Sequence, residues 1–405
     1  MQTGLQASLL KERPTKAFVS VLVFGCILYF LMKAVQSALP SVLFDYALWW
    51  KEIEHSALYR FLWMIGDATE PHFHKTLLGG LGVTVGSFIA YRLDKARSPK
   101  AGTPVCYGTG LWPWVFASSV FSLGLSILLF GGLRNEDGWV PTFVPYVSVA
   151  GCVILLYGGG MANMLTGAFF GALLTVPITL FLRQYVCLPM NLPGVIGSVS
   201  GMWLGGILVF ELCHILPWMR KLPPPPGEHN AGAAAVTAMK RERPNEFFVR
   251  RMIADYSEPM FVGNEIAGAC LILGSMLTWL LSPNQPYYGT GWFPALIFCQ
   301  IITGAIALYA YWPGWRDGDF FPSFVPVVSV APGVVLAHGP SLFVIVCSAV
   351  LGGLLSPPVA NMANRCIPAH WHPMIGFTFS MAFCTLVVSS LIKYLLMAFP
   401  FLGSY

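Results

Sequence analysis

Charged residues are scarce in this sequence: Asp, Glu, Lys and Arg make up 10% of its 405 residues. A soluble domain usually carries about 25% charged residues, so the composition excludes an ordinary soluble protein. Hydrophobic residues make up 56%, and apolar runs long enough to cross about 30 Å of hydrocarbon recur along the chain. Because backbone groups in lipid must be satisfied within their own segment, we expect these runs to be helices. The predicted fold class is an all-α polytopic membrane protein.

Two motifs are also missing. None of the ten cysteines forms a Cys-x-x-Cys pair, so we interpret them as small buried hydrophobic residues. No Gly-x-x-x-x-Gly-Lys-Ser/Thr loop is present, so the chain lacks this nucleotide-binding fingerprint. Any transport it performs would therefore draw on an ion gradient or on the gradient of the substrate itself, unless a separate ATPase subunit supplies the energy.

What the chain does contain is a copy of part of itself. Tyr-Gly-Thr-Gly at 107–110 returns at 288–291, an offset of 181 (288 minus 107). At the same offset, Pro-x-Phe-Val-Pro-x-Val-Ser-Val-Ala at 141–150 returns at 322–331, with eight of ten positions identical. In a membrane chain such a repeat indicates two structural halves with a binding site between them.

The repeat extends upstream of these motifs. Met64–Pro71 matches Met252–Pro259 at an offset of 188 (252 minus 64), and both segments contain Asp-x-x-Glu-Pro. The offset falls from 188 to 181 because the first copy has seven extra residues in its basic loop. We therefore expect each half to begin with a short interfacial helix that ends in this motif.

The apolar runs predict one extra N-terminal span at 17–39 and five spans in each half. The first half has spans near 77–91, 112–132, 141–159, 161–183 and 192–216, and the second near 262–282, 293–312, 322–339, 341–361 and 373–398. We assign residues 1–56 to a cytoplasmic tail, the first span and an external interfacial segment. Residues 57–216 form repeat 1, residues 217–244 a basic, Pro-rich cytoplasmic linker, and residues 245–405 repeat 2.

The distribution of basic residues predicts the orientation of the two repeats. An odd number of spans per half places the halves in opposite orientations. If the linker is cytoplasmic, 16 of the 23 Lys and Arg residues lie on that side and six on the other, as the positive-inside rule requires. We therefore expect a multi-pass protein of the cell membrane, of the bacterial inner-membrane type, with its N-terminus and linker cytoplasmic and its C-terminus opposite.

The repeated proline motif is the strongest candidate for a binding site. Two prolines four residues apart disturb any helix that contains both, and in lipid such a break is tolerated where it lines a cavity. We therefore expect broken third helices in both repeats. The predicted substrate-binding residues are Phe143, Pro145, Ser148, Gly151, Phe324, Pro326, Ser329 and Gly333, together with Thr109 and Thr290 of the Tyr-Gly-Thr-Gly motifs.

A purely structural interpretation of these motifs stays open. The prolines would then only begin a helix, and the serines would bond back to the preceding turn. Tyr-Gly-Thr-Gly would be a turn before a helix, with its threonine as a cap.

Ionisable residues inside the predicted spans are few and costly to bury. Glu265, beside Asn264 at a helix start, and His338, after the second proline motif, are the predicted coupling or proton sites. No cofactor is expected; if transport is coupled to an ion, we expect H⁺ or Na⁺. Glu211 and Lys393 occupy similar places in the last span of each half and are interpreted as interfacial residues that extend outward.

The Asp-x-x-Glu-Pro motif has two interpretations. Asp67 and Asp255 have the spacing of a capping box, with glutamate three residues on. Alternatively, Asp67, Glu70, His72 and His74 form the cluster of a membrane-embedded metal-dependent enzyme. The second copy has Met260 and Val262 in place of the histidines, so a symmetric metal function is not expected.

The function predicted from these patterns is secondary active transport of a small organic solute by alternating access. The expected partners are the lipid bilayer and a small-molecule substrate, without nucleic acid; a homodimer, or a partner subunit at the basic linker, stays open. The alternatives are the membrane-embedded enzyme and a channel whose proline motifs are re-entrant.

Overall fold

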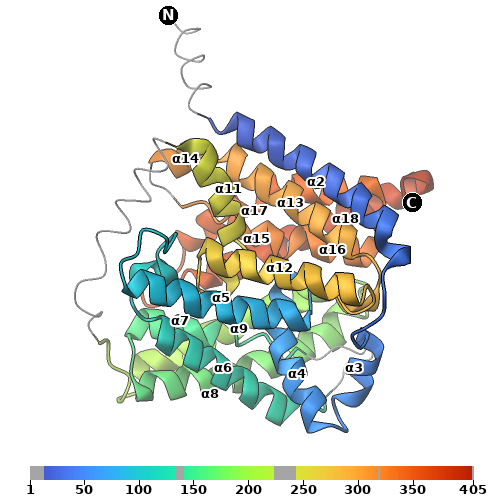
Figure 1. The fold of residues 1–405 in the computed structure, drawn as a ribbon. Helices are drawn as coiled ribbons and strands as arrows, with labels where there is room; N and C mark the ends of the chain where they lie inside the picture. The colour runs from blue at the N-terminus through green and yellow to red at the C-terminus, as the bar shows by residue number, and fades with distance from the viewer. Residues whose placement is uncertain (1–12, 134–140, 223–242, 318–319, 404–405) are drawn as a thin grey trace, which may run out of the picture.

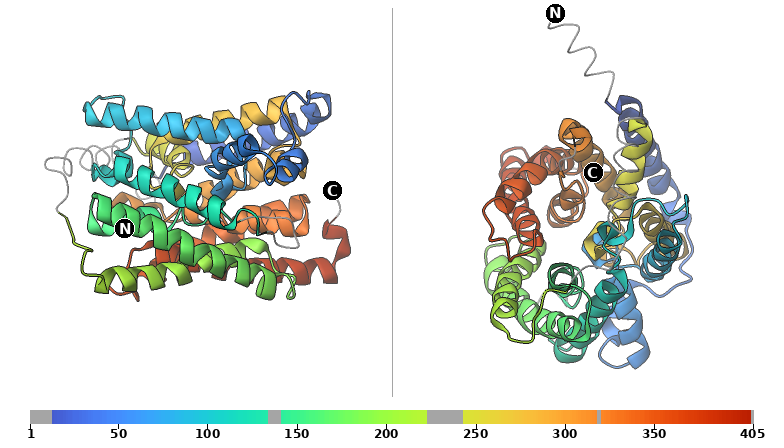
Figure 2. Two further views of the ribbon diagram at one scale, coloured as in Figure 1. Left: turned by 90° about the horizontal axis from the view of Figure 1, so that it is seen from below. Right: turned by 90° about the vertical axis from the view of Figure 1, so that its left-hand side faces the viewer.

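The computed structural model describes residues 13–133, 141–222, 243–317 and 320–403, and within these ranges the chain forms helices and no strands. The predicted linker prolines at 223–226, together with Lys240 and Arg241, lie outside the described residues. Most of the long helices run in roughly the same direction across the molecule (Figure 1), and the right-hand view of Figure 2 looks along them. The prediction of an all-helical fold is confirmed.

The helices are distributed over both halves of the chain. In the first half they are α2 (Thr15–Val35), α3 (Tyr46–Glu52), α4 (Ala57–Asp67), α5 (Leu77–Lys95), α6 (Trp112–Phe130), α7 (Val149–Tyr157), α8 (Met161–Leu182) and α9 (Gly194–Ile215). In the second half they are α11 (Pro244–Ala254), α12 (Glu265–Leu281), α13 (Phe293–Ala310), α14 (Trp312–Asp317), α15 (Phe324–Val327), α16 (Val330–His338), α17 (Leu342–Asn364) and α18 (Met374–Ala398).

Seven helices in the described part of the chain are long and apolar enough to cross a membrane. They are Thr15–Ala38, Trp112–Phe130, Met161–Cys187, Gly194–Ile215, Phe293–Ala310, Leu342–Asn364 and Met374–Ala398. These segments coincide with the extra first span and with the second, fourth and fifth spans predicted for each half. The chain is therefore a membrane-embedded helical protein.

The other four predicted spans do not form helices of this kind. α5 is long enough but ends in Arg92, Asp94 and Lys95, and α12 has 17 residues. α7 has nine residues, which is about 14 Å of helical rise and too short to cross a bilayer. In the equivalent segment of the second half, α15 and α16 are separate helices.

The helices form two groups, with α5 and α12 between them in the view of Figure 1 and at the edge of the molecule in Figure 2. In Figure 1, α6, α7, α8 and α9 occupy the lower part and α13, α16, α17 and α18 the upper part, with α5 and α12 side by side between them. α18 packs against both α17 and α9, so it joins the two groups. α2 packs on α13 and α11 at the outer edge, and most of its surface faces outward.

α5 and α12 approach closely because small residues line their contact. A methyl group on Gly82 would lie 2.3 Å from the carbonyl oxygen of Cys270, and one on Gly274 would lie 2.2 Å from the carbonyl oxygen of Leu78. Gly86 in turn faces Cys270 and Ala267. The two helices run antiparallel, because residues later in α5 contact residues earlier in α12. Backbone lies directly opposite backbone here, so there is no room for larger side chains.

We expect Gly82→Ala to destabilise the protein by about 1–3 kcal/mol, the usual cost of forcing an extra methyl group into a packed contact. The matched control is Gly124→Ala on α6, where no atom lies within 4 Å of the added methyl group and the gain in helix propensity is up to about 1 kcal/mol. Thermal unfolding of the two purified variants in detergent measures the difference. Equal unfolding temperatures would contradict the close contact of α5 and α12.

The ends of the short helices agree with the sequence only in part. α4 ends at Asp67 and α11 ends at Ala254, just before Asp255, so the prediction that each short helix ends in Asp-x-x-Glu-Pro is confirmed. The capping-box interpretation is wrong, because both aspartates lie at the C-terminal end of a helix. Their carboxylates are instead paired with buried cations, as described below.

Candidate functional site

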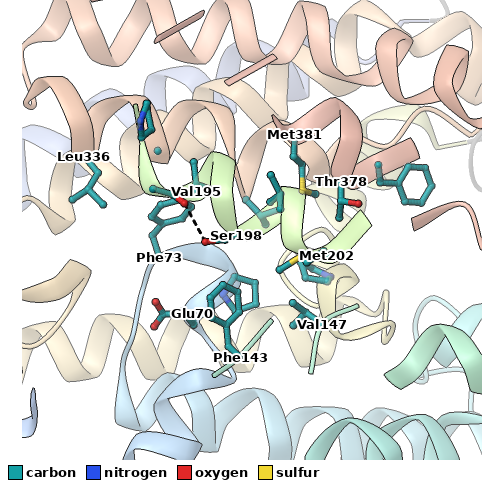
Figure 3. A pocket seen from close by; sticks show the side chains of 18 of the residues that line it. Glu70, Phe73, Phe143, Val147, Val195, Ser198, Met202, Leu336, Thr378 and Met381 are labelled. Carbon is teal, nitrogen blue, oxygen red and sulfur yellow. Dashed lines mark hydrogen bonds between the residues drawn. The ribbon is translucent and has the colours of Figure 1, made fainter. Parts of the chain in front are cut away.

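A cavity of about 590 Å³ lies between the two halves of the chain. Figure 3 shows part of its wall, including Glu70, Phe73, Phe143, Ser198 and Met202. Residues at equivalent repeat positions line it in pairs: Glu70 and Glu258, Pro71 and Pro259, Phe73 and Phe261, Tyr107 and Tyr288, Phe143 and Phe324, and Val147 and Val328. The remaining wall comes largely from α9, α18 and the end of α16. Both copies of the repeated motifs therefore face one space.

The first copy of the Asp-x-x-Glu-Pro motif takes part in a buried ion-pair cluster. The Lys75 ammonium contacts Asp67 and lies 3.4 Å from Oε2 of Glu70, and all three side chains are at most 1% exposed. Thr142 Oγ1 donates a 2.6 Å hydrogen bond to the second oxygen of Asp67. The ammonium also lies 3.5 Å from the centre of the Trp63 ring, a cation–π arrangement. The cluster holds two carboxylates and one cation.

The second copy of the Asp-x-x-Glu-Pro motif takes part in an equivalent cluster with a different cation. Arg251 donates from Nη2 to Oδ1 of Asp255 at 2.5 Å and to Oε2 of Glu258 at 2.9 Å. These three side chains are also buried. The guanidinium lies 5.4 Å from the centre of the Trp315 ring. Again two carboxylates share one cation.

The two cations come from non-equivalent positions. At the offset of 188, Arg251 corresponds to Trp63 (251 minus 188), and Lys75 corresponds to Gly263 (75 plus 188). The first copy thus has an aromatic ring where the second has its cation, and the second has glycine where the first has its lysine. Both copies have the aspartate and glutamate pair, but the basic residue that pairs with it occupies a different repeat position in each copy.

Burial raises the pKa of Asp67 and of Asp255 to about 6, while the neighbouring Lys75 or Arg251 opposes the rise. Neither aspartate belongs to one of the seven candidate spans. Because both pKa values are raised, burial outweighs the adjacent cation in each cluster and disfavours the charged form of the aspartate.

Each half contributes a tyrosine to the glutamate of the other half. The Tyr288 hydroxyl donates a 2.9 Å hydrogen bond to Oε1 of Glu70, and the Tyr107 hydroxyl is hydrogen-bonded to Glu258. Both tyrosines have left-handed backbones, with φ of 60° at Tyr107 and 59° at Tyr288. Such a backbone is uncommon outside glycine, so its occurrence at both equivalent positions indicates a constrained turn.

Backbone hydrogen bonds also connect each half to the other. The Cys106 amide donates to the Val262 carbonyl at 3.0 Å, and the Tyr287 amide donates to the His74 carbonyl at 2.9 Å. At the two offsets, Cys106 corresponds to Tyr287 and His74 to Val262. The Tyr-Gly-Thr-Gly turn of each half is therefore attached to the Glu-Pro loop of the other half.

We expect Tyr288→Phe to lower the free energy of unfolding by about 1.5–3 kcal/mol, because it removes a hydrogen bond to a carboxylate. Tyr107→Phe should lower it by a smaller amount, because that side chain is 50% exposed. Tyr185→Phe is the matched control, since that side chain is 68% exposed. The measurement is thermal unfolding at constant pH. A loss in only one of the two variants would contradict the equivalence of the two contacts.

The predicted binding residues divide into two groups. Phe143, Phe324, Gly333 and His338 line the cavity. The other predicted residues do not belong to its wall: Pro145, Ser148, Gly151, Pro326, Ser329, Thr109, Thr290, Asn264 and Glu265.

The two serines of the proline motif bond to their own segments. Ser148 Oγ donates to the Val144 carbonyl and Ser329 Oγ to the Val325 carbonyl, both at 2.6 Å. Both hydroxyls are buried. This is the back-bonding geometry of the structural interpretation, and it occurs identically in both copies.

The threonines of the Tyr-Gly-Thr-Gly motif are also engaged locally. Thr109 donates to the Cys106 carbonyl and accepts from the Leu111 amide. Thr290 makes the same two bonds in the second copy, to Tyr287 and from Trp292. In both copies the threonine closes the turn before a long helix. Gly151 lies behind the cavity wall, where a methyl group would meet the ring of Phe261 at 2.5 Å.

The predicted coupling residues lie in two places. Asn264 caps α12 and donates to the carbonyls of Ala101 and Thr103. Glu265 pairs with Arg250 and accepts from the Thr103 amide at 2.8 Å. His338, at the cavity wall, bonds to the Ser389 hydroxyl at 2.8 Å.

The histidines of the alternative metal cluster point away from the carboxylates. His74 uses its two ring nitrogens on Ser275 Oγ at 2.9 Å and on Gln300 Oε1 at 3.1 Å. His72 stacks on Tyr256, with 5.3 Å between the ring centres. Asp67 and Glu70 are held by Lys75. Within the described ranges, no group of three or more His, Cys, Asp or Glu residues could hold a metal ion.

A polar contact connects α9 with the loop before α18. The Glu211 carboxylate accepts from His370 at 2.9 Å and from the Trp371 indole at 2.8 Å. His372, two residues after His370, belongs to the cavity wall. The contact therefore lies just beyond the α18 N-terminal end of the cavity.

Sequence reasoning missed the tyrosines and the glutamate of the second copy as site residues. Tyr107, Tyr288 and Glu258 all belong to repeated motifs, so repetition was the signal that could have found them. The threonines and serines of those motifs were predicted as site residues because their hydroxyls can form hydrogen bonds. That capacity does not determine which side chain faces the space between the halves.

The chain was compared with known protein families and with curated proteins. No family model and no curated protein matches it.

Proposed function

We propose that this protein is a secondary active transporter that moves a small organic solute across a membrane by alternating access. The solute binds in the cavity between two repeats of inverted topology. The observation that carries the proposal is the pairing of the cavity wall, to which both copies of Glu-Pro-x-Phe, Tyr-Gly-Thr-Gly and Pro-x-Phe-Val-Pro contribute. In inverted-repeat transporters the substrate site lies between the repeats in this way.

The contacts of α5 with α12 support inversion. Gly82 touches Cys270, its own equivalent at offset 188, and the contact of Gly86 with Ala267 is reciprocated by that of Gly274 with Gly79. Reciprocal contacts of this form are expected around a two-fold axis. Because the equivalent helices run antiparallel, the axis is perpendicular to them. α5 and α12 run alongside the long apolar helices (Figure 1), so we propose that this axis lies in the membrane plane and relates two inverted repeats.

The proline motifs support a broken helix in each repeat. The helix after the motif begins at Val149 in the first copy and at Val330 in the second, and the preceding serine has non-helical backbone angles in both. We propose that these interrupted segments are the third helices of the repeats. Interrupted helices at corresponding points of both halves are typical of transporter sites.

The two ends of the cavity differ in a way that fits one state of an alternating cycle. At one end its wall includes Asn191, an exposed residue, and Lys393. Beyond the other end lies the contact of Glu211 with His370 and Trp371, which we propose closes that end. We propose that the state described is open at the Asn191 end, which the positive-inside rule assigns to the non-cytoplasmic side. Transport is driven by H⁺ or Na⁺, or by the solute gradient.

A channel is the second candidate, because the wall includes both Met374 and Lys393 of α18, which are 19 positions apart or about 29 Å of helical rise. This length is close to the thickness of the hydrocarbon core. A channel would conduct with both ends open at once, whereas a transporter closes one end before it opens the other.

Thermal unfolding against a panel of small organic solutes, followed by uptake into proteoliposomes, tests the proposal. A solute that binds the folded state stabilises it by about 2.7 kcal/mol at a hundredfold excess over Kd. We expect Phe143→Ala, in the cavity wall, to remove the shift and the uptake. Phe121→Ala, on the exposed face of α6, should keep both. Uptake that is unaffected by Phe143→Ala, or conductance without saturation, would overturn the proposal.

A further inference from the structure

A second cavity, of about 470 Å³, lies at the outer edge of the molecule, where α2 ends and α13 begins. The two helices run antiparallel. The ring of Phe18 stacks on that of Tyr309 near one end of the pair. At the other end, Gln36 donates a 2.8 Å hydrogen bond to the Gly291 carbonyl, and both residues line the cavity.

The ends of three candidate spans place this cavity at the boundary of the membrane. Its wall includes Ser37 in the last turns of the first span, Pro294 in the first turn of α13, and Pro340, two residues before α17. The aromatic side chains Tyr29 and Trp292 also line it, and such residues are enriched at membrane interfaces. The cavity therefore lies at the level of the lipid headgroups.

The wall of this cavity carries a positive charge. Lys33 is the one charged side chain among the described residues that line it. Its ammonium lies 5.7 Å from the centre of the Tyr29 ring and forms no ion pair with any described part of the chain. Ser37, Ser41 and Asn284 also line the cavity and are exposed. A wall of ammonium, hydroxyl and amide donors without a carboxylate suits an anionic group.

An exposed apolar stripe on α2 leads to this charge. Val23, Ile27 and Phe30 are each more than half exposed and are spaced four and three residues apart. Lys33 follows Phe30 by three residues and Ser37 follows it by seven, so helical periodicity places all five side chains on one face. A ligand that contacts both parts of this face has an anionic head and an apolar tail.

We infer that this cavity binds the headgroup of an anionic phospholipid, with Lys33 against the phosphate and an acyl chain along the stripe of α2. A free phosphate ion shares the chemistry of the head but would leave the stripe unused. Pockets with basic residues between membrane helices are known receptors for anionic headgroups. The inference does not depend on the transport proposal, because it concerns the outer surface of the molecule.

The site belongs to one half of the chain. α2 precedes the repeated segments of the sequence, and it meets Gly291 and Trp292 at the end of the second Tyr-Gly-Thr-Gly turn. The equivalent residues of the first copy, Gly110 and Leu111, do not belong to this wall. A bound phospholipid would therefore hold the unrepeated first span against the turn of the second half.

Binding of three probes to the purified, delipidated protein in detergent tests the inference. The probes are dioleoyl phosphatidylglycerol, dioleoyl phosphatidylcholine and inorganic phosphate. Native mass spectrometry counts the bound lipids, and thermal unfolding follows the titrations. We expect phosphatidylglycerol to bind saturably and phosphatidylcholine about fivefold more weakly, the factor that one lysine contributes near anionic lipid. Equal binding of the two lipids, or the same stabilisation by inorganic phosphate alone, would overturn the inference.

Variants of α2 test the site itself. Lys33→Met should weaken phosphatidylglycerol binding about fivefold and leave phosphatidylcholine binding unchanged. Lys33 is exposed, so the lipid-free variant should unfold at the temperature of the unmodified protein. Lys51→Met, on α3 and outside this wall, is the matched control. Unchanged affinity for phosphatidylglycerol in Lys33→Met would contradict the assigned role of Lys33.

The apolar part of the site is tested separately. Phe30→Ala should weaken the binding of dioleoyl phosphatidylglycerol but not that of its dihexanoyl form, whose chains are too short to follow the stripe. Phe121→Ala, at an exposed position of α6, is the control. The competing occupant of the stripe is a second copy of the chain. A lipid-free dimer in native mass spectra that Phe30→Ala dissociates would show that the stripe is a subunit interface and overturn the inference.

Discussion

A Lys75→Met variant should lose about 3–5 kcal/mol of stability, the usual cost of removing one partner of a buried ion pair. The substitution keeps most of the side-chain volume but leaves the Asp67 and Glu70 carboxylates, both at most 1% exposed, without their cation. The yield of folded protein from detergent and its unfolding temperature measure the effect. Lys51→Met, at an exposed position of α3, is the matched control.

Restoring the charge balance should restore stability. Adding Asp67→Asn to Lys75→Met returns the net charge of the three-residue cluster from two negative charges to the one of the wild type, so we expect the double variant to recover part of the loss. A Lys75→Met protein as stable as the Lys51→Met control would show that Lys75 does not neutralise the cluster.

The second copy offers a test of equivalence between the repeats. Arg251→Met should be destabilised for the same reason as Lys75→Met. Gly263 corresponds to Lys75 and has φ of 61°, near the 47° of Lys75 itself. A methyl group at Gly263 would lie 2.8 Å from Oε2 of Glu258, so the end of the Glu258 side chain must shift to admit a lysine there. We expect Gly263→Lys to recover part of the stability lost in Arg251→Met.

Cross-linking Glu211 to His370 should reduce transport to the level of protein-free liposomes. Cysteines at these positions, joined by a bifunctional methanethiosulfonate, would hold the end of α9 to the loop before α18. In the proposed cycle this end of the cavity is closed and must later open, because a transporter needs both ends in turn, and the cross-link would prevent that opening. Reduction of the cross-link should restore uptake. The exposed cysteines, Cys26 and Cys366, are replaced by serine beforehand.

The control for this experiment is a cross-link that joins no moving parts. Arg243 and Glu246 lie three residues apart at the start of α11 and form an exposed pair, so cysteines there can be bridged within one helix. Uptake should survive this bridge. If it also survives the bridge between Glu211 and His370, that contact is not a gate.

The sequence predicted the seven long apolar helices and the ends of the short helices because these depend on local pattern. It failed at Asp67 and Asp255, where the capping-box spacing suggested a helix start. The partners of these aspartates are Lys75, eight residues later, and Arg251, four residues earlier. Since the two copies use different cations at different positions, no single local motif describes the cluster.

The site was only partly predictable for the same reason. Phe143 and Phe324 were expected in the wall and lie there. The bond of Tyr288 to Glu70 joins residues 218 positions apart, and a contact between the repeats leaves no periodicity in either segment. Ser148 and Ser329 illustrate the converse, because a hydroxyl in a repeated motif bonds to its own turn and not to the cavity.

The most direct test of alternating access asks from which side the cavity can be reached. Ser198, in the cavity wall, and Asn191, at its exposed end, are replaced singly by cysteine in a protein without Cys26 and Cys366. A membrane-impermeant thiol reagent is then added to vesicles of either orientation. We predict that Asn191→Cys reacts from one side only and that Ser198→Cys reacts from both sides, with substrate changing the ratio. Reaction of Ser198→Cys from the Asn191 side alone, with or without substrate, would contradict alternating access.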